Sequence, residues 1–150
     1  MLPIISNELD FFLFRLLESY RFFFKESLID DHAFTIQYLF EQPFVLLAHG
    51  NESDPILKYG NKKALELWEM NWGDFTKMPS RLTAEADLQE NRNQLLKDVK
   101  NKGYSNNYSG IRISKSGQRF FVKNVLVWNI LDINKKYLGQ AAMFKEWEYQ

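Results

Sequence analysis

Arg112 and Tyr108 are the residues whose types and spacing best suit recognition of a small molecule. They lie in a stretch that alternates like a β-strand, so Tyr108, Gly110 and Arg112 are expected on one face. An arginine on such a face extends its guanidinium to solvent, pairs with a carboxylate such as Glu66 or Glu69, or presents a planar fork to a carboxylate or phosphate. The sequence leaves these three uses open.

Asn124 and Trp128 form a second candidate group, in the long apolar run over residues 118–131. Strict alternation along this run places Asn124 and Trp128 on one face and Val125 and Val127 on the other. We expect the first face to be concave and covered by helices, and the second to lie under the N-terminal helix. A buried amide without a partner costs about 1–3 kcal/mol, so Asn124 needs a ligand, a backbone group or Tyr108 across the hairpin.

The remaining chemistry-bearing residues form no recognisable catalytic or metal-binding pattern. His32 and His49 are far apart in the sequence, and the chain has no cysteine. Glu66 and Glu69 lie three residues apart, but no nucleophile or base accompanies them, so we interpret them as surface charges. The sequence therefore predicts no metal site and no catalytic residue.

The composition is that of one globular domain. The 150 residues are 45% apolar, 16% aromatic and 25% charged, and the formal net charge is zero. A neutral chain has no electrostatic footprint for nucleic acid. The lack of cysteine excludes disulfides, thiol catalysis and thiolate-bound metal, and is compatible with a reducing compartment. No 18-residue uncharged apolar run and no secretory leader is visible, so we expect a cytoplasmic protein without a membrane partner.

A long helix is predicted over residues 6–28, with apolar residues around most of its circumference. Such a helix must be covered on more than one side. The simplest arrangement has the chain's own sheet on one side and a second subunit on the other, with Phe12, Leu16, Tyr20 and Phe23 at a homodimer interface. Burial wholly within one core is the alternative, and a membrane-surface helix is disfavoured by a polar face poor in cations.

The other predicted elements follow an order typical of an α+β fold. We expect a short helix over residues 31–41, strands over 44–50 and 56–60, and helices over 62–69 and 87–102. The chain is β from residue 104 onward, with a hairpin turn at Ser116 and Gly117 and a last strand over 137–147. Strands at both ends of a helical segment indicate an antiparallel sheet. We place a boundary near Pro43, between a helical cap over residues 1–42 and a core over residues 43–150.

Several segments resemble the MEKHLA family of PAS-like domains. They are residues 47–50 (LAHG), 54–56 (DPI), 59–61 (YGN), 64–70 (ALELWEM), 79–82 (PSRL), 107–114 (NYSGIRIS), 127–129 (VWN) and 139–142 (GQAA). The resemblance implies a five-stranded antiparallel sheet in the order 2-1-5-4-3, with helices over one face and an N-terminal helical extension. The family also occurs at the C-terminus of plant homeodomain–leucine-zipper regulators. Neither of those regions is present here, so DNA binding does not carry over.

The resemblance extends the candidate site, because small ligands bind at the concave face of a PAS fold. Tyr59, Trp68 and Trp72 would then wall the cavity, where they either stack against a flat ligand or form ordinary core. Gln140 follows a glycine in the last strand, although the flavin-contacting glutamine of light-sensing members would fall at Ala141. The full ligand-binding prediction comprises Tyr59, Trp68, Trp72, Arg81, Tyr108, Arg112, Asn124, Trp128 and Gln140.

The resemblance does not identify a cofactor. Light-sensing flavin members need a cysteine, and haem-binding members usually ligate iron through a histidine on the long helix. This chain has no cysteine, and residues 87–102 contain no histidine. We therefore expect neither covalent flavin nor helix-ligated haem, and leave non-covalent flavin or a small metabolite open.

The sequence thus predicts a non-enzymatic sensory or interaction module. It would bind a small molecule or a protein partner, form a homodimer and signal through its N-terminal helix. Two alternatives stay open. One is a small α+β enzyme that uses Arg81 or Arg112 on an anionic metabolite in an enclosed cavity, and the other is a ligand-free structural adaptor with a solid core.

Overall fold

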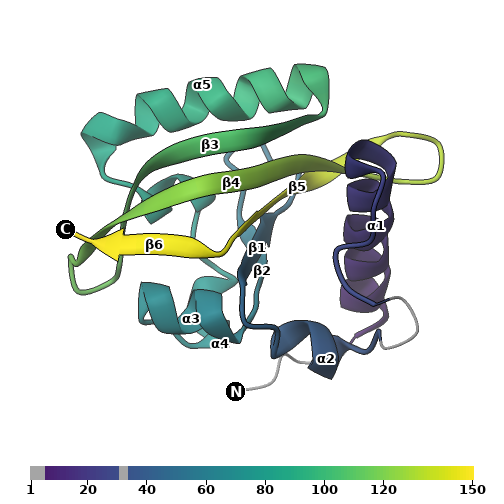
Figure 1. The fold of residues 1–150 in the computed structure, drawn as a ribbon, viewed down its shortest axis with the longest axis horizontal. Helices are drawn as coiled ribbons and strands as arrows, with labels where there is room; N and C mark the ends of the chain where they lie inside the picture. Colours follow the sequence, from purple (N-terminus) through teal and green to yellow (C-terminus); the bar gives the residue numbers. More distant parts are fainter. Residues whose placement is uncertain (1–5, 31–33) are drawn as a thin grey trace.

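The computed structural model describes residues 6–30 and 34–150, apart from the side chains of residues 86–92, and is built on one antiparallel sheet (Figure 1). The strands are β1 (Val45–His49), β2 (Leu57–Gly60), β3 (Tyr104–Ile113), β4 (Arg119–Leu131), β5 (Tyr137–Phe144) and β6 (Glu146–Tyr149). Their order is β2-β1-β5-β4-β3, and β6 pairs with β4 outside this path. The predicted α+β fold and strand order are therefore confirmed, with a sixth strand added.

Helices lie on both faces of the sheet (Figure 1). They are α1 (Asn7–Phe24), α2 (Ile36–Phe40), α3 (Lys62–Trp68), α4 (Trp72–Phe75), the 3-10 helix η2 (Ser80–Thr83) and α5 (Ala86–Lys102). Trp128 and Asn129 are consecutive in β4, so their side chains point to opposite faces. Trp128 donates to a carbonyl of α1, whereas Asn129 donates to carbonyls of α5. The sheet is thus covered by α1 on one face and by α5 on the other.

Asn61 fixes the start of α3 and joins it to the sheet. Its Oδ1 accepts hydrogen bonds from the backbone N–H of Ala64 and of Leu46, both at 3.1 Å. Its Nδ2 donates to the carbonyl oxygen of Phe44 at 2.7 Å. Asn61 is thus the N-cap of α3, and the same amide also satisfies backbone groups at the first strand.

Strand β4 changes its facing at Asn124. This residue has a positive φ of 53° and is exposed, and the β3–β4 register shifts beside it. The extra residue of such a bulge inverts the alternation that follows it. Val125 and Val127 consequently face the helices α3 and α5, and Trp128 faces α1. The predicted face assignment is therefore wrong for Asn124, Trp128 and both valines.

The last predicted strand is also two strands rather than one. β5 ends at Phe144, and β6 pairs with the first part of β4 through Phe120↔Tyr149 and Lys123↔Glu146. Asn124 lies where β4 leaves one partner strand and meets the other, since Leu126 pairs with Met143 of β5. The bulge at Asn124 and the break between β5 and β6 therefore occur at the same place along β4.

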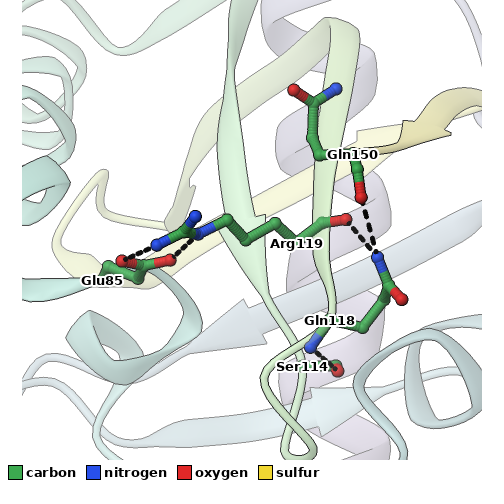
Figure 2. Close-up of polar contacts among 5 residues, drawn as sticks. All are labelled: Glu85, Ser114, Gln118, Arg119 and Gln150. Carbon is green, nitrogen blue, oxygen red and sulfur yellow. Dashed lines mark hydrogen bonds and ion pairs between the residues drawn. The ribbon is translucent and has the colours of Figure 1, made fainter.

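Figure 2 shows the polar contacts that hold the start of β4 and the C-terminal residue Gln150. The backbone N–H of Gln150 donates to the carbonyl oxygen of Arg119 at 3.0 Å, and Gln118 Nε2 donates to the carbonyls of Arg119 and Gln150. Arg119 forms an ion pair with Glu85, which precedes α5. Gln118 N–H also donates to Ser114 Oγ, across the turn that the sequence predicts at Gly117.

The helix α1 buries most of its apolar stripe against its own sheet. Phe12, Leu16 and Tyr20 are buried within the protomer, and Phe23 packs on Tyr104 with ring centroids 5.6 Å apart. These are the residues predicted to meet a second subunit. The aromatic residues that α1 does expose are Phe11, Phe14 and Phe22, at 55%, 49% and 45%. No helix in the described part of the chain is long and apolar enough to cross a membrane.

Candidate ligand cavity

A cavity of about 60 Å³ lies between the sheet and the helical layer of α3, η2 and α5. A cavity needs at least about 10–15 Å³ to hold one water, so there is room for a few waters or a compact molecule of a few heavy atoms. The apolar lining includes Leu47, Leu57, Leu95, Leu96, Val122, Val125, Val127 and Ala142, and the polar lining includes His49, Trp68, Ser80, Thr83, Tyr108, Arg112 and Gln140. The cavity is therefore apolar with a few polar groups, as ligand sites commonly are.

Arg112 and Tyr108 meet on the cavity side of β3. Arg112 donates from one terminal nitrogen to the Tyr108 hydroxyl at 3.0 Å and from the other to the Ile111 carbonyl at 2.9 Å. The guanidinium carbon lies 5.2 Å from the centroid of the Tyr108 ring. Among the described residues, no carboxylate forms an ion pair with Arg112. Glu69, one of its predicted partners, instead accepts from the backbone N–H of Ser116 at 3.0 Å.

Gly110 leaves room for the side chains of Tyr108 and Arg112 because it has no side chain of its own. A Cβ on Gly110 would lie 2.5 Å from the Tyr108 hydroxyl oxygen and 3.4 Å from a terminal nitrogen of Arg112. The tyrosine hydroxyl therefore lies directly over the glycine, where any other residue would displace it. The shared face predicted for Tyr108, Gly110 and Arg112 is confirmed, and it faces the cavity.

Trp68 brings an indole to the same cavity from α3. The residue is buried, and its ring packs edge-to-face on Phe120 with centroids 5.1 Å apart. Phe120 is the direct partner of Arg112 across the β3–β4 pair. The indole Nε1–H of Trp68 is buried without an acceptor among the described residues. An indole N–H is a donor only, so an acceptor in the cavity would satisfy it.

The side-chain amides of Gln140 and Asn129 form a chain of hydrogen bonds between the sheet and α5. Gln140 Nε2 donates to the Leu96 carbonyl at 3.1 Å and to Asn129 Oδ1 at 3.0 Å. Asn129 Nδ2 in turn donates to the carbonyls of Val99 and Lys100, both at 3.1 Å. These amides fasten the C-terminal part of α5 to the sheet. Asn129 was not among the predicted ligand-binding residues, because strict alternation places it on the same face as Val125 and Val127, which was expected to lie under the N-terminal helix.

The structure gathers four of the nine predicted ligand-binding residues around the cavity: Trp68, Tyr108, Arg112 and Gln140. The other five lie elsewhere. Tyr59 and Trp72 pack on each other with ring centroids 5.8 Å apart, and burial raises the pKa of the Tyr59 hydroxyl. Arg81 forms a 3.3 Å ion pair with Asp54 at the surface, Asn124 is exposed, and Trp128 lies under α1.

Hydrogen bonds join α1 to the C-terminal part of β4, next to the residues that line the cavity. Trp128 Nε1 donates to the Leu16 carbonyl at 3.0 Å, and Arg15 Nε donates to the Leu131 carbonyl at 2.8 Å. The backbone N–H of Leu131 donates to Ser19 Oγ at 2.8 Å. Val127, which lines the cavity, directly precedes Trp128 in the strand. The cavity and α1 are thus separated by the thickness of one strand.

A sheet in the order β2-β1-β5-β4-β3, with a cavity beneath the helices of one face, defines a PAS-like domain. The chain belongs to the MEKHLA family, because the family model of the MEKHLA domain matches residues 12–149. The matched region includes most of α1 as well as the whole sheet. A search of curated proteins finds no match to the chain.

Solved structures similar to this one are PAS and light-oxygen-voltage domains. The PAS domain of a protein from Colwellia psychrerythraea is 12% identical, with a TM-score of 0.63 over 71% of this chain and 88% of its own. A light-oxygen-voltage domain studied with a flavin analogue is 9% identical, with a TM-score of 0.61 over 77% and 83%. An RNA-binding light-oxygen-voltage receptor is 10% identical, with a TM-score of 0.64 over 79% and 34%. At such identities these structures show the fold alone.

Proposed function

We propose that this MEKHLA domain is a non-enzymatic sensory module that binds a small molecule in the cavity and reports its presence through α1. The observation that supports it is the adjacency of Val127 and Trp128 in β4. Val127 lines the cavity on one face, and Trp128 donates a hydrogen bond to α1 on the other. A ligand that moves this part of β4 therefore acts on both faces of the sheet.

The signal requires two packings of α1 that differ in ligand affinity. A ligand shifts such an equilibrium only by its differential affinity for the two states. In the described packing, α1 is held at Trp128 and at both backbone groups of Leu131. Displacement of β4 on ligand binding changes the geometry of these bonds together, because they lie within four residues of one strand. In this proposal, residues 43–150 form the sensor and residues 1–42 carry its output.

The output partner in this proposal is a second copy of the chain, which would cover the exposed face of α1. Phe11, Phe14 and Phe22 recur at helical spacing and are exposed, whereas Phe12, Leu16 and Tyr20 face the protomer's own core. The proposed interface therefore uses the opposite side of the helix from the one predicted. The lack of cysteine fits a place in the cytoplasm, where thiols stay reduced and disulfides are rare.

The predicted enzymatic alternative has less support from the geometry. Arg81 is paired with Asp54 at the surface, and no carboxylate of the described residues pairs with Arg112. The described part of the cavity thus offers a binding group without a neighbouring carboxylate base. A metabolite turnover screen with the unmodified protein and Arg112→Ala separates the two functions, because only an enzyme shows turnover that the substitution abolishes.

Native mass spectrometry of the full chain, purified from its own host, tests ligand binding directly. The proposal predicts a mass above that of the chain, with the excess lost on denaturation. Ala142→Leu adds side-chain volume to the cavity lining and should reduce the retained ligand, whereas Asn107→Leu at an exposed position of β3 should not. Chain mass alone in every preparation would contradict the proposal and favour the ligand-free adaptor.

A further inference from the structure

We propose that the cavity selects a compact monocarboxylate, whose carboxylate group is bound by Arg112 beside Tyr108. This inference rests on the proposed function, because it names the ligand class of the same cavity. It starts from the fact that three polar groups in the cavity lining can donate hydrogen bonds. These groups are the guanidinium of Arg112, the hydroxyl of Tyr108 and the indole of Trp68.

The charge of the site favours an anion. Arg112 is permanently charged and half-buried, and its recorded partners, the Tyr108 hydroxyl and the Ile111 carbonyl, are both uncharged. No carboxylate of the described residues neutralises it. A guanidinium fork matches a planar carboxylate in two parallel hydrogen bonds, and charge-assisted bonds are about twice as strong as neutral ones.

The buried indole of Trp68 provides an independent argument. Its Nε1–H has no acceptor among the described residues, although Trp68 is only 2% exposed and lines the cavity. A buried donor without an acceptor costs about 1–3 kcal/mol. A ligand oxygen would remove that cost. Trp68 packs on Phe120, the strand partner of Arg112, so the two residues approach the cavity from neighbouring positions.

Tyr108 and Gly110 orient the guanidinium toward the cavity. The tyrosine hydroxyl accepts from Arg112 at 3.0 Å and lies over the glycine, in space that a Cβ would fill. A hydroxyl held in this way positions the arginine on the strand surface instead of leaving it to extend into solvent. The arrangement therefore prepares Arg112 for a ligand before the ligand arrives.

The size and lining of the cavity favour a carboxylate over a phosphate as the ligand. The volume of about 60 Å³ suits a few heavy atoms, and valines and leucines make up much of the lining. A phosphate group carries about −1.5 to −2 charges at pH 7 and at least three acceptor oxygens. One arginine and an apolar wall instead match a single negative charge on a short apolar chain, such as propionate.

The test is titration of the ¹⁵N-labelled full chain with sodium propionate, followed by the indole N–H signals in NMR spectra. Propionamide, which is neutral and of the same size, and sodium phosphate serve as comparison probes. We expect saturable propionate binding that shifts the Trp68 signal, with at least tenfold weaker binding of propionamide and of phosphate. Arg112→Gln should weaken propionate binding about tenfold or more, whereas Arg81→Gln removes the same charge outside the cavity and should leave it unchanged.

The outcomes separate this inference from the proposed function. Equal binding of propionate and propionamide, or tighter binding of phosphate, would overturn the monocarboxylate class while leaving a ligand-binding cavity. The comparison of probes uses the unmodified protein, so it holds even if Arg112→Gln fails to fold. No binding of any probe would also overturn the inference. The mass of a ligand retained from the host then decides separately whether the proposed function stands.

Discussion

The indole Nε1–H of Trp128 donates a 3.0 Å hydrogen bond to the carbonyl oxygen of Leu16, which joins the central strand β4 to the middle of α1. Trp128 is fully buried, and its ring lies edge-on to Tyr20 with centroids 4.9 Å apart. The preceding residue, Val127, lines the cavity on the other face. This bond therefore links the strand beside the proposed ligand to the proposed output helix.

Replacement of Trp128 with phenylalanine should loosen α1. The change removes the hydrogen bond to Leu16 and leaves unfilled volume, so we expect the free energy of unfolding to fall by about 1–3 kcal/mol. Hydrogen exchange of the α1 amides should rise as well. Trp147→Phe is the matched control, because Trp147 is only partly buried and its indole donates to none of the described residues. Equal losses in the two variants would show that the Trp128 bond has no special role.

Substitutions at Asn124 test the bulge that reverses the facing of β4. A β-branched residue pays about 1–2 kcal/mol in the left-handed region, whereas glycine enters it freely. With φ at 53°, Asn124→Val should lower the free energy of unfolding in urea by about 1–2 kcal/mol, and Asn124→Gly should be close to neutral. Asn107→Val at an exposed position without a positive φ should change stability by less than about 0.5 kcal/mol. A neutral Asn124→Val would contradict the bulge.

The family resemblance was sufficient for the sheet order, and the regular alternation in β3 was sufficient for the face shared by Tyr108 and Arg112. The sequence was not sufficient to predict which residues of β4 lie on each face. Both faces of that strand are apolar, so no hydrophobic pattern marks where the alternation inverts. An asparagine within an apolar strand was the available signal, since asparagine tolerates a positive φ better than most residues. Asn124 was instead expected to be a buried ligand contact.

The same limit applies to α1. Its apolar residues surround most of the helix, and sequence alone could not decide which side meets the sheet. The structure buries Leu16 and Tyr20 and exposes Phe11 and Phe14, because Trp128 of β4 lies against the side that carries Leu16 and Tyr20. The face of β4 that carries Trp128 depends in turn on the bulge at Asn124.

Glu69 should make the protein sensitive to acid. Hydrogen bonds from the Ser114 and Ser116 hydroxyls, and from the Ser116 backbone N–H, lower the pKa of its carboxyl below the usual value. A carboxyl with a lowered folded-state pKa stabilises the fold above its unfolded pKa, and that contribution is lost as the pH falls through the folded pKa. Glu69→Gln keeps the shape but cannot titrate. We therefore expect a flatter dependence of the melting temperature on pH below about 4.5 in the variant.

The control for this experiment is Glu66→Gln, which removes a carboxyl of the same helix at an exposed position. Its melting temperature should follow that of the unmodified protein through the acid range. Parallel curves for all three proteins would contradict the role given to the hydrogen bonds of Glu69.

Introduction of charge on the exposed apolar face of α1 tests the proposed dimer. Phe11→Asp combined with Phe14→Asp places two carboxylates on the exposed face, where they would repel a second copy. Light scattering coupled to size-exclusion chromatography should show a dimer for the unmodified protein and a monomer for the variant. Leu82→Asp alters another exposed apolar residue, in η2, and should remain dimeric. A monomeric unmodified protein would contradict the proposed dimer.

The most direct test of the central claim is whether filling the cavity changes α1. Xenon enters apolar cavities without needing a specific ligand, so NMR spectra of the full chain can be recorded under increasing xenon pressure. The account predicts that the Val127 amide, the Trp128 indole and the Leu16 and Tyr20 amides shift along one saturation curve. Saturable shifts at Val125 and Val127, with the Trp128 indole and the whole of α1 unchanged, would contradict it.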